Sequence, residues 1–88
     1  MATEDADAVR ETVRETLLKF APAKPETLTK DTKLVADMAY HSLAIMEVIF
    51  TLEEKLEVEL VDDGTTGQIT TVGDVEDYVL KVMAQAAQ

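Results

Sequence analysis

The sequence of 88 residues lacks cysteine altogether and has a single histidine, His41. Without cysteine the chain can form no disulfide, no thiolate metal site and no thiol nucleophile. Hydrolytic catalysis by Ser42 is disfavoured too, because the only histidine directly precedes it, and consecutive side chains at a helix start do not face each other. These absences predict a protein that is not an enzyme and that has no metal site.

Basic residues and long apolar runs are also scarce. Lysine and arginine number 8 against 18 aspartate and glutamate residues, which gives a net charge of −10. Such a chain repels nucleic acids and anionic membrane surfaces, so we expect partners with basic protein patches. No stretch reaches the roughly 18 apolar residues of a membrane span, and the first twenty residues do not resemble a signal peptide. Together with the absence of cysteine, these features favour a cytoplasmic protein.

The remaining composition is that of a folded chain. Apolar residues make up 47% of the sequence, well above the range of disordered segments. The length predicts one domain, spanning residues 1–88, which we expect to be monomeric. A domain of this size buries about 60 to 65% of its unfolded surface, which leaves little room for a deep catalytic pocket.

Helical spacing of apolar residues predicts three substantial helices. The first covers residues 5–20, with an apolar stripe at Val9, Val13, Leu17 and Phe20. The second covers residues 42–56, with a core face at Ile45, Ile49, Leu52 and Leu56. The third opens with Thr71 three residues before Asp74, a pattern typical of a capping box, and has an apolar face at Val75, Val79 and Val82.

The connections between these helices differ in character. Residues 21–41 show no sustained period and predict a long ordered loop, anchored to the core by Leu28, Leu34, Val35 and Met38. The threonine-rich stretch after residue 61 predicts a turn, with at most a short helical turn around residues 67–69. The fold class expected from these elements is a small all-α bundle.

The helix at residues 42–56 is more apolar than one buried stripe requires. A second side carries Leu43, Met46 and Phe50, beside the acidic residues Glu47, Glu53 and Glu54. Exposed apolar residues flanked by charges are typical of a protein-binding surface, in which the apolar groups supply affinity and the charges steer the partner. The alternative is that Met46 and Phe50 complete the core.

Two interpretations of Ser42 remain besides catalysis. As a helix N-cap, its hydroxyl would accept a hydrogen bond from a first-turn amide, which is worth about 1 kcal/mol. As a modification site, it would present its hydroxyl where free amides and the positive end of the helix stabilise an attached phosphate. The residues alone leave both interpretations open.

A family resemblance favours the second interpretation of Ser42, the modification site. Residues 34–79, LVADMAYHSLAIMEVIFTLEEKLEVELVDDGTTGQITTVGDVEDYV, resemble an acyl carrier protein in several parts that occur in the same order. These parts are Asp37 and Met38 before the serine, the pair Ser42 and Leu43, and the segments LEEKLEVEL and ITTVGDVEDYV. The resemblance implies a four-helix bundle of acyl-carrier type, with a short third helix and a long loop between helices one and two.

The resemblance also implies a cofactor and partners. Ser42 would be esterified by a 4′-phosphopantetheine arm, which a phosphopantetheinyl transferase takes from coenzyme A and whose thiol carries the cargo as a thioester. Basic docking patches on acyltransferase, ketosynthase or adenylating enzymes would then bind the recognition helix. Its contact residues would be Leu43, Met46, Glu47, Phe50, Glu53 and Glu54.

One part of the motif is distinctive. Fatty-acid carriers usually have GADSL where this chain has MAYHSL, so that His41 stands in the place of an aspartate. Histidine there is more typical of peptidyl carriers, which favours a role in polyketide or hybrid polyketide and nonribosomal peptide biosynthesis. His41 would either contact the phosphate of the arm or be a tolerated polar residue. An unmodified acidic adaptor, which binds a basic partner through the second helix, is the alternative function.

Overall fold

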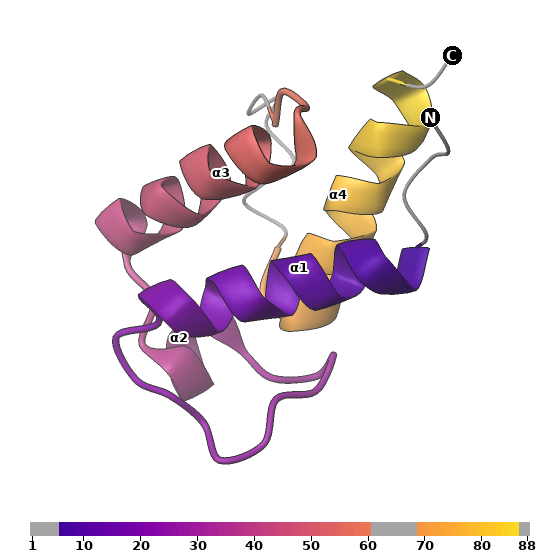
Figure 1. Cartoon of the computed structure of the whole chain (residues 1–88). Helices are drawn as coiled ribbons and strands as arrows, with labels where there is room; N and C mark the ends of the chain where they lie inside the picture. The colour runs from indigo at the N-terminus through magenta and orange to yellow at the C-terminus, as the bar shows by residue number, and fades with distance from the viewer. Residues whose placement is uncertain (1–5, 61–68, 87–88) are drawn as a thin grey trace.

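The computed structural model describes residues 6–60 and 69–86, and the regular elements within them are helices (Figure 1). The helices are α1 (Ala6–Phe20), α2 (Leu34–Met38), α3 (Ser42–Leu56) and α4 (Val72–Ala86). The all-α class predicted from the sequence is thereby confirmed. The short helix expected around residues 67–69 falls largely on residues 61–68, which lie outside the described part of the chain.

Helix α1 follows its predicted apolar stripe. Val9, Val13 and Leu17 are buried, whereas Phe20 is half-buried and packs on the edge of the core. Thr16 is also buried, and its hydroxyl donates a hydrogen bond to the Thr12 carbonyl at 2.8 Å. This bond satisfies the hydroxyl inside the helix, so that a polar residue can lie in the core at little energetic cost.

The segment predicted as one long loop contains a helix of its own, α2. Its five residues are too few for a helical period to be visible in the sequence. The Asp37 carboxylate accepts a hydrogen bond from the backbone N–H of Lys33 at 2.8 Å, which supports the first turn. Leu34 and Met38, four residues apart, are buried as predicted, but Val35 is exposed. The prediction that Val35 anchors this segment was therefore wrong.

The core face of α3 matches the predicted one at Leu52 and Leu56 and differs from it nearer the start of the helix. Its buried residues are Ala44, Val48, Leu52 and Leu56, which recur every fourth position. Ile45 and Ile49, predicted as core, are only half-buried. Periodicity located the helix correctly, but this helix has more apolar residues than one buried face needs. Packing against α1 buries the smaller residues Ala44 and Val48 instead of the two isoleucines.

Helix α4 begins with the predicted capping box. The Asp74 carboxylate accepts hydrogen bonds from the backbone N–H groups of Thr70 at 3.0 Å and Thr71 at 3.1 Å. In return, the Asp74 N–H donates to the Thr71 hydroxyl at 3.2 Å. The backbone hydrogen bonds to its charged form lower the pKa of Asp74 below its ordinary value. The shorter aspartate thus performs the function usual for glutamate in this motif.

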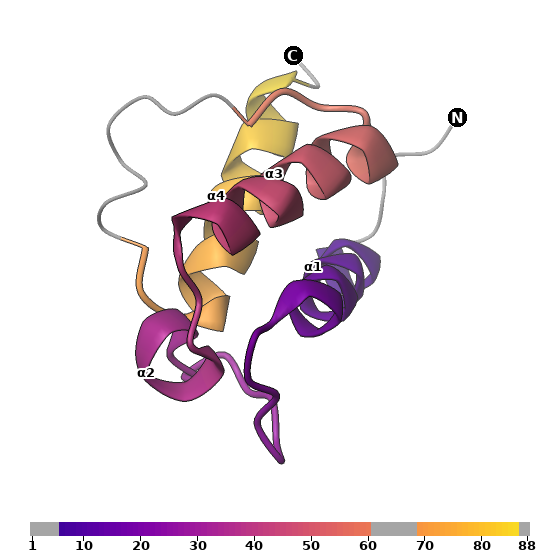
Figure 2. The same ribbon diagram turned by 90° about the vertical axis from the view of Figure 1, so that its left-hand side faces the viewer.

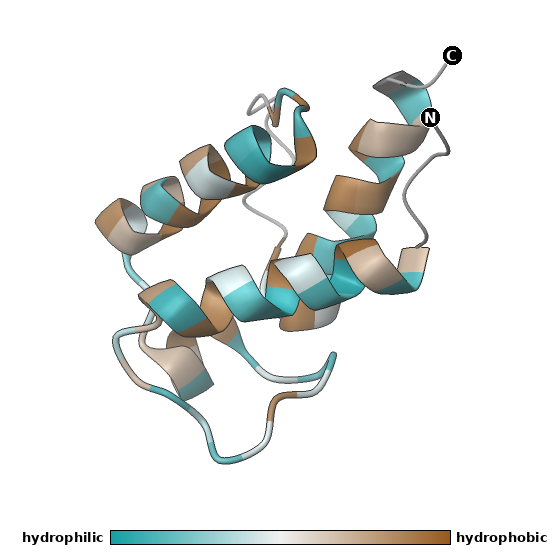
Figure 3. Ribbon diagram, in the orientation of Figure 1, coloured by the Kyte–Doolittle hydropathy of each residue, from teal (hydrophilic) through white to brown (hydrophobic). Residues whose placement is uncertain are grey.

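Helix α1 packs against both α3 and α4, and it runs along one side of these two helices (Figures 1 and 2). The apolar residues of the long helices gather on their inward sides (Figure 3). On α4, Val79 is buried while Val75 and Val82 are half-buried. The two helices that contact α1 thus share one core with it.

A short backbone pairing ties the segment before α2 to the start of α4. The Leu34 N–H donates to the Thr70 carbonyl at 2.9 Å, and the Val72 N–H donates to the Thr32 carbonyl at 2.9 Å. Gly73 allows the close approach, since a Cβ atom there would lie 3.0 Å from the Lys30 carbonyl oxygen. The pairing places the short α2 helix at a defined position beside the bundle.

An ion-pair cluster joins α1 to α4. Glu76 is fully buried, and its two carboxylate oxygens pair with Arg10 and Arg14, which lie one turn apart on α1. Arg10 also reaches the exposed carboxylate of Asp77 at 3.4 Å. The sequence showed only alternating charges here, and the burial of Glu76 was not anticipated.

Candidate functional site

Ser42 is the first helical residue of α3 and is exposed. The N-cap position belongs to His41, whose backbone is extended and whose side chain makes no capping hydrogen bond. Within the described residues the Ser42 hydroxyl has no hydrogen-bond partner. The interpretation of Ser42 as the helix cap was therefore wrong, and its hydroxyl is available for chemistry.

The backbone before Ser42 is held in place on several sides. Ala39 adopts the left-handed conformation with φ 58°, and its N–H donates to the Val35 carbonyl at 3.0 Å. The Tyr40 N–H donates to the Leu34 carbonyl at 3.0 Å, and the Met38 carbonyl accepts a hydrogen bond from Ala23 at 3.0 Å. This conformation favours glycine, which explains why a carrier motif with glycine at this position fits the same turn.

The Tyr40 side chain provides a further anchor. It is 3% exposed, and its hydroxyl donates a 2.5 Å hydrogen bond to the carbonyl of Leu17 in the last turn of α1. Carbonyls in the last turn of a helix lack partners within that helix, so Tyr40 satisfies a group that would otherwise be unpaired. Burial, and secondarily the negative charge of Glu47, raises the pKa of Tyr40 to about 12.

We expect Tyr40→Phe to lower the free energy of unfolding by about 1 to 3 kcal/mol at neutral pH, because the Leu17 carbonyl loses its partner. The raised pKa adds a pH signature. The unfolded tyrosine ionises near pH 10 and the folded one near 12, so the stabilisation is complete below pH 10 and is lost as the pH rises through 12. Urea unfolding of both proteins between pH 7 and 12 tests this. A difference that does not shrink above pH 10 would contradict it.

The apolar residues predicted for the outer side of α3 do face outward. Leu43 is 66% exposed, Met46 is 49% exposed and Phe50 is 60% exposed. The alternative that Met46 and Phe50 complete the core was therefore wrong. Glu47 and Glu54 are exposed as well. We refer to these five residues as the α3 strip.

Glu53 differs from its acidic neighbours. It is half-buried, and its carboxylate accepts a hydrogen bond from the Leu60 N–H at 2.8 Å. Its backbone carbonyl also accepts the N–H of Glu57, the left-handed residue that ends α3. Glu53 thus holds the backbone that follows α3 in place, and its side chain is less available to a partner than those of Glu47 and Glu54.

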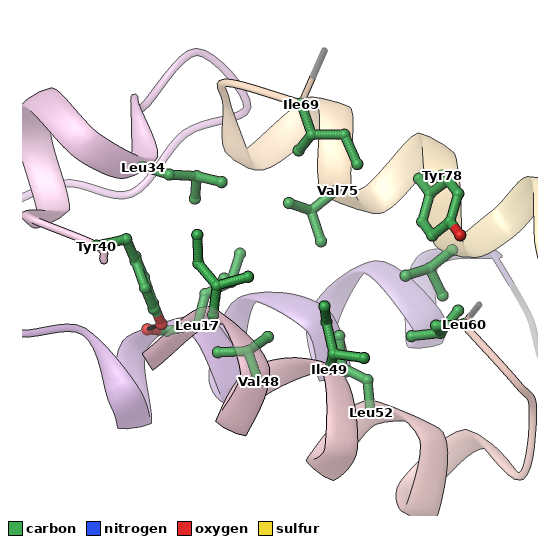
Figure 4. A pocket seen from close by; sticks show the side chains of 12 residues that line it. Leu17, Leu34, Tyr40, Val48, Ile49, Leu52, Leu60, Ile69, Val75 and Tyr78 are labelled. Carbon is green, nitrogen blue, oxygen red and sulfur yellow. Dashed lines mark hydrogen bonds between the residues drawn. The ribbon is translucent and has the colours of Figure 1, made fainter. Parts of the chain in front are cut away.

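A cavity of about 90 Å³ lies among α1, α3 and α4 (Figure 4). Its lining is apolar apart from the hydroxyls of Tyr40 and Tyr78, and it contains no charged side chain among the described residues. The half-buried Ile45 and Ile49 line this cavity, which explains why they are not packed into the core centre. The other lining residues are Leu17, Leu34, Val48, Leu52, Leu60, Ile69, Val75 and Val79.

Comparison with known proteins decides what this geometry serves. Residues 9–79 match the family model described as a phosphopantetheine attachment site. The chain is 32% identical to an acyl carrier protein of Wolinella succinogenes, with 82% of this chain and 93% of that protein aligned. It is also 32% identical to an acyl carrier protein of Sulfurovum sp., over 85% of this chain and 99% of that protein.

The chain belongs to the acyl carrier family. The resemblance seen in the sequence is thereby confirmed. Members of this family are carriers and not enzymes, and the cofactor of this carrier is 4′-phosphopantetheine. None of the described helices is long and apolar enough to cross a membrane.

The residues of the carrier around Ser42 fit a phosphate group. The first turn of α3 contains no acidic residue, and His41 makes no side-chain cap, so the first amides of a 15-residue helix are free to donate to an anion. The positive end of the helix dipole lies at the same place. An anchored phosphodiester at Ser42 is therefore compatible with the local charge and hydrogen-bonding groups.

Two features of the carrier were missed by sequence reasoning. Tyr40 was passed over although it is the aromatic residue nearest the serine, because nothing in the sequence indicates that its hydroxyl reaches α1. The cavity was also missed, since a void depends on how three helices pack. The sequence carries no signal for it, because Ile45 and Ile49, which line the cavity, have the spacing of ordinary core residues.

Proposed function

We propose that Ser42 carries the 4′-phosphopantetheine arm of this carrier. The observation that supports this most is the exposed hydroxyl of Ser42 at the start of α3, which has no hydrogen-bond partner among the described residues and lies inside the matched residues 9–79. The arm supplies a terminal thiol that holds cargo as a thioester. The protein itself positions the attachment residue, and the hydrogen bonds of Tyr40 and Ala39 hold the preceding backbone rigid.

The test is the intact mass of the purified protein after incubation with coenzyme A, magnesium and a broad-specificity phosphopantetheinyl transferase. We expect a gain of one phosphopantetheinyl group, and peptide mapping should locate it on Ser42. A folded protein that gains no mass would instead favour the unmodified acidic adaptor. Circular dichroism of the same sample distinguishes that result from simple misfolding.

We propose that the α3 strip is the surface read by partner enzymes. Its exposed apolar groups are large, and burying them against a partner would supply binding energy. The net charge of −10 supports partners with basic docking patches, namely the transferase and an acyltransferase, ketosynthase or adenylating enzyme. Glu53 belongs to this surface by position, although its bond to Leu60 assigns it mainly a structural role.

We expect Phe50→Ala to slow transfer from the loaded carrier about 5- to 30-fold, which corresponds to about 1 to 2 kcal/mol of lost binding. Glu47→Lys should act through the association rate and should lose its effect at high salt. The measurement is transfer kinetics with one partner enzyme at two salt concentrations. Glu11→Lys, on the exposed side of α1, is a matched charge reversal that should change neither rate. Unfolding of Phe50→Ala would show that Phe50 is core after all.

We propose that the cargo is an acyl group sheltered in the apolar cavity. The lack of charged groups in the described lining supports an acyl rather than an aminoacyl cargo, because a buried ammonium group would have no counterion there.

As for the pathway, His41 before the serine supports polyketide or hybrid polyketide and nonribosomal peptide biosynthesis. We also propose that the carrier works in the cytoplasm as a monomer, in keeping with its composition.

His41→Asp tests whether the histidine has a role of its own. If His41 assists the phosphate or the partner, we expect the aspartate variant to be loaded and to transfer cargo several-fold more slowly, because a carboxylate beside the phosphate adds repulsion. Loading rates across pH 5.5 to 8 give the decisive measurement. Identical rates for the two proteins throughout this range would mean that His41 is only a tolerated polar residue. His41→Asn removes the imidazole without adding charge.

A further inference from the structure

The cavity is bounded by Tyr40, which lies only two residues before Ser42. Figure 4 shows Tyr40 and Tyr78 on opposite sides of this space, with the aliphatic lining residues between them. Tyr40 comes from the segment that leads into α3, whereas Tyr78 comes from α4. The Tyr40 ring is therefore the bulky wall of the cavity on the side of the attachment segment.

This wall is fixed more firmly than the aliphatic side chains of the lining. The Tyr40 hydroxyl is bonded to the Leu17 carbonyl at 2.5 Å, and its N–H is bonded to the Leu34 carbonyl at 3.0 Å. Leu17 and Leu34 both line the same cavity. A leucine or isoleucine can make room by changing rotamer, but an aromatic ring with two side-chain torsions, bonded at its far end, cannot do so without breaking that bond.

We propose that Tyr40 is the residue that limits the size of the acyl group this carrier can shelter. The inference rests on the proposed role of the cavity in holding cargo. At about 90 Å³ the cavity is smaller than the engineered cavity of about 150 Å³ that accepts benzene in another protein core. A chain longer than this space allows stays in solvent, because the wall formed by Tyr40 does not yield.

The first experiment measures the cavity without any arm or cargo, using benzene as the probe on the unmodified protein. We expect benzene to raise the melting temperature of Tyr40→Ala and to shift the NMR methyl signals of Val48 and Ile49. The parent protein and Tyr40→Phe should show neither effect, because both retain the ring. Benzene binding to the parent protein at the same concentration would overturn the proposal, since the cavity would not be limited by this ring.

The second experiment uses carriers loaded with straight-chain acyl groups of increasing length and follows cleavage of the acyl group by hydroxylamine. In the parent protein we expect protection to stop rising at a short chain length. In Tyr40→Ala it should keep rising, by about fourfold for each further buried methylene, the change that corresponds to about 0.8 kcal/mol. Tyr40→Phe keeps the ring but loses the hydrogen bond that fixes it, so it should shift the limit less than Tyr40→Ala does. Where Tyr40→Ala fails to fold, Tyr40→Leu replaces it in the series.

The outcomes separate this inference from the proposed function. An unchanged chain-length limit in a folded Tyr40→Ala or Tyr40→Leu protein overturns the role of Tyr40, while rising protection in the parent protein still supports a sheltered cargo. A parent protein with no dependence on chain length would instead contradict sheltering itself, and the limit set by Tyr40 with it. A shift of the limit in Tyr40→Phe as large as that in Tyr40→Ala would assign the limit to the hydrogen bond alone, and would overturn the role of the ring.

Discussion

Ser42→Ala is expected to abolish the mass gain produced by coenzyme A and a phosphopantetheinyl transferase. The loss should be complete, because Ser42 is the only serine of the chain and the variant has no hydroxyl at the start of α3. All transfer of cargo should disappear with it. The measurement is intact-protein mass after overnight incubation, compared with Thr27→Ala, which removes an exposed hydroxyl elsewhere and should load normally.

The stability of Ser42→Ala tests separately whether Ser42 caps α3. If Ser42 capped α3, its loss would cost about 0.5 to 2 kcal/mol. Because the N-cap position belongs to His41 and Ser42 is exposed, we expect the free energy of unfolding to change by less than about 0.5 kcal/mol, as for an ordinary surface substitution. A loaded Ser42→Ala protein would place the arm on another residue. A variant that unfolds would mean that Ser42 has a structural role that the structure does not indicate.

Replacing both Arg10 and Arg14 with glutamine should lower the free energy of unfolding by about 3 to 5 kcal/mol. Glu76 is 0% exposed and pairs with both guanidinium groups, so the double variant leaves a buried carboxylate without a charged partner. Glutamine has nearly the helix propensity of arginine, so the change acts on the ion pairs rather than on α1 itself. Urea unfolding at pH 7 measures the loss.

Two single variants provide the matched controls. Glu76→Gln should be less damaging, because the arginine side chains are 38% exposed and can turn toward water once the carboxylate is gone. Asp77→Asn should have an effect of only about 0 to 1 kcal/mol, since the Asp77 carboxylate is exposed. A double arginine variant that is more stable than Glu76→Gln would contradict the asymmetry between buried and exposed charges.

Local patterns explain why much of the fold could be predicted. Long helices with apolar stripes, such as the one through Val9, Val13 and Leu17, reveal their type and buried side through spacing alone. The capping box of Thr71 and Asp74 is equally local, because its hydrogen bonds join residues three apart. The helix α2 lacked such a signal, since five residues do not complete two turns.

The α3 helix shows where local patterns stop being sufficient. Its apolar residues outnumber the positions that a small bundle can bury, and the sequence assigned Ile45 and Ile49 to the core while leaving the α3 strip outside. The structure keeps the strip exposed but buries Ala44 and Val48 instead. Small residues allow α1 and α3 to approach closely, and this choice depends on a partner helix that is distant in sequence.

The sequence by itself determined that this protein is an acidic, cysteine-free, helical carrier with a serine at the start of its most apolar helix. Those properties depend on composition, on short-range spacing and on an ordered family motif. Only the tertiary structure decided that Ser42 does not cap α3, that Tyr40 is bonded to α1 beside a cavity, and that Glu76 is buried between two arginines. The last two depend on groups that are distant along the chain, namely Tyr40 and Leu17, and Glu76 and the two arginines. Such contacts arise when helices pack, and spacing within one helix carries no record of them.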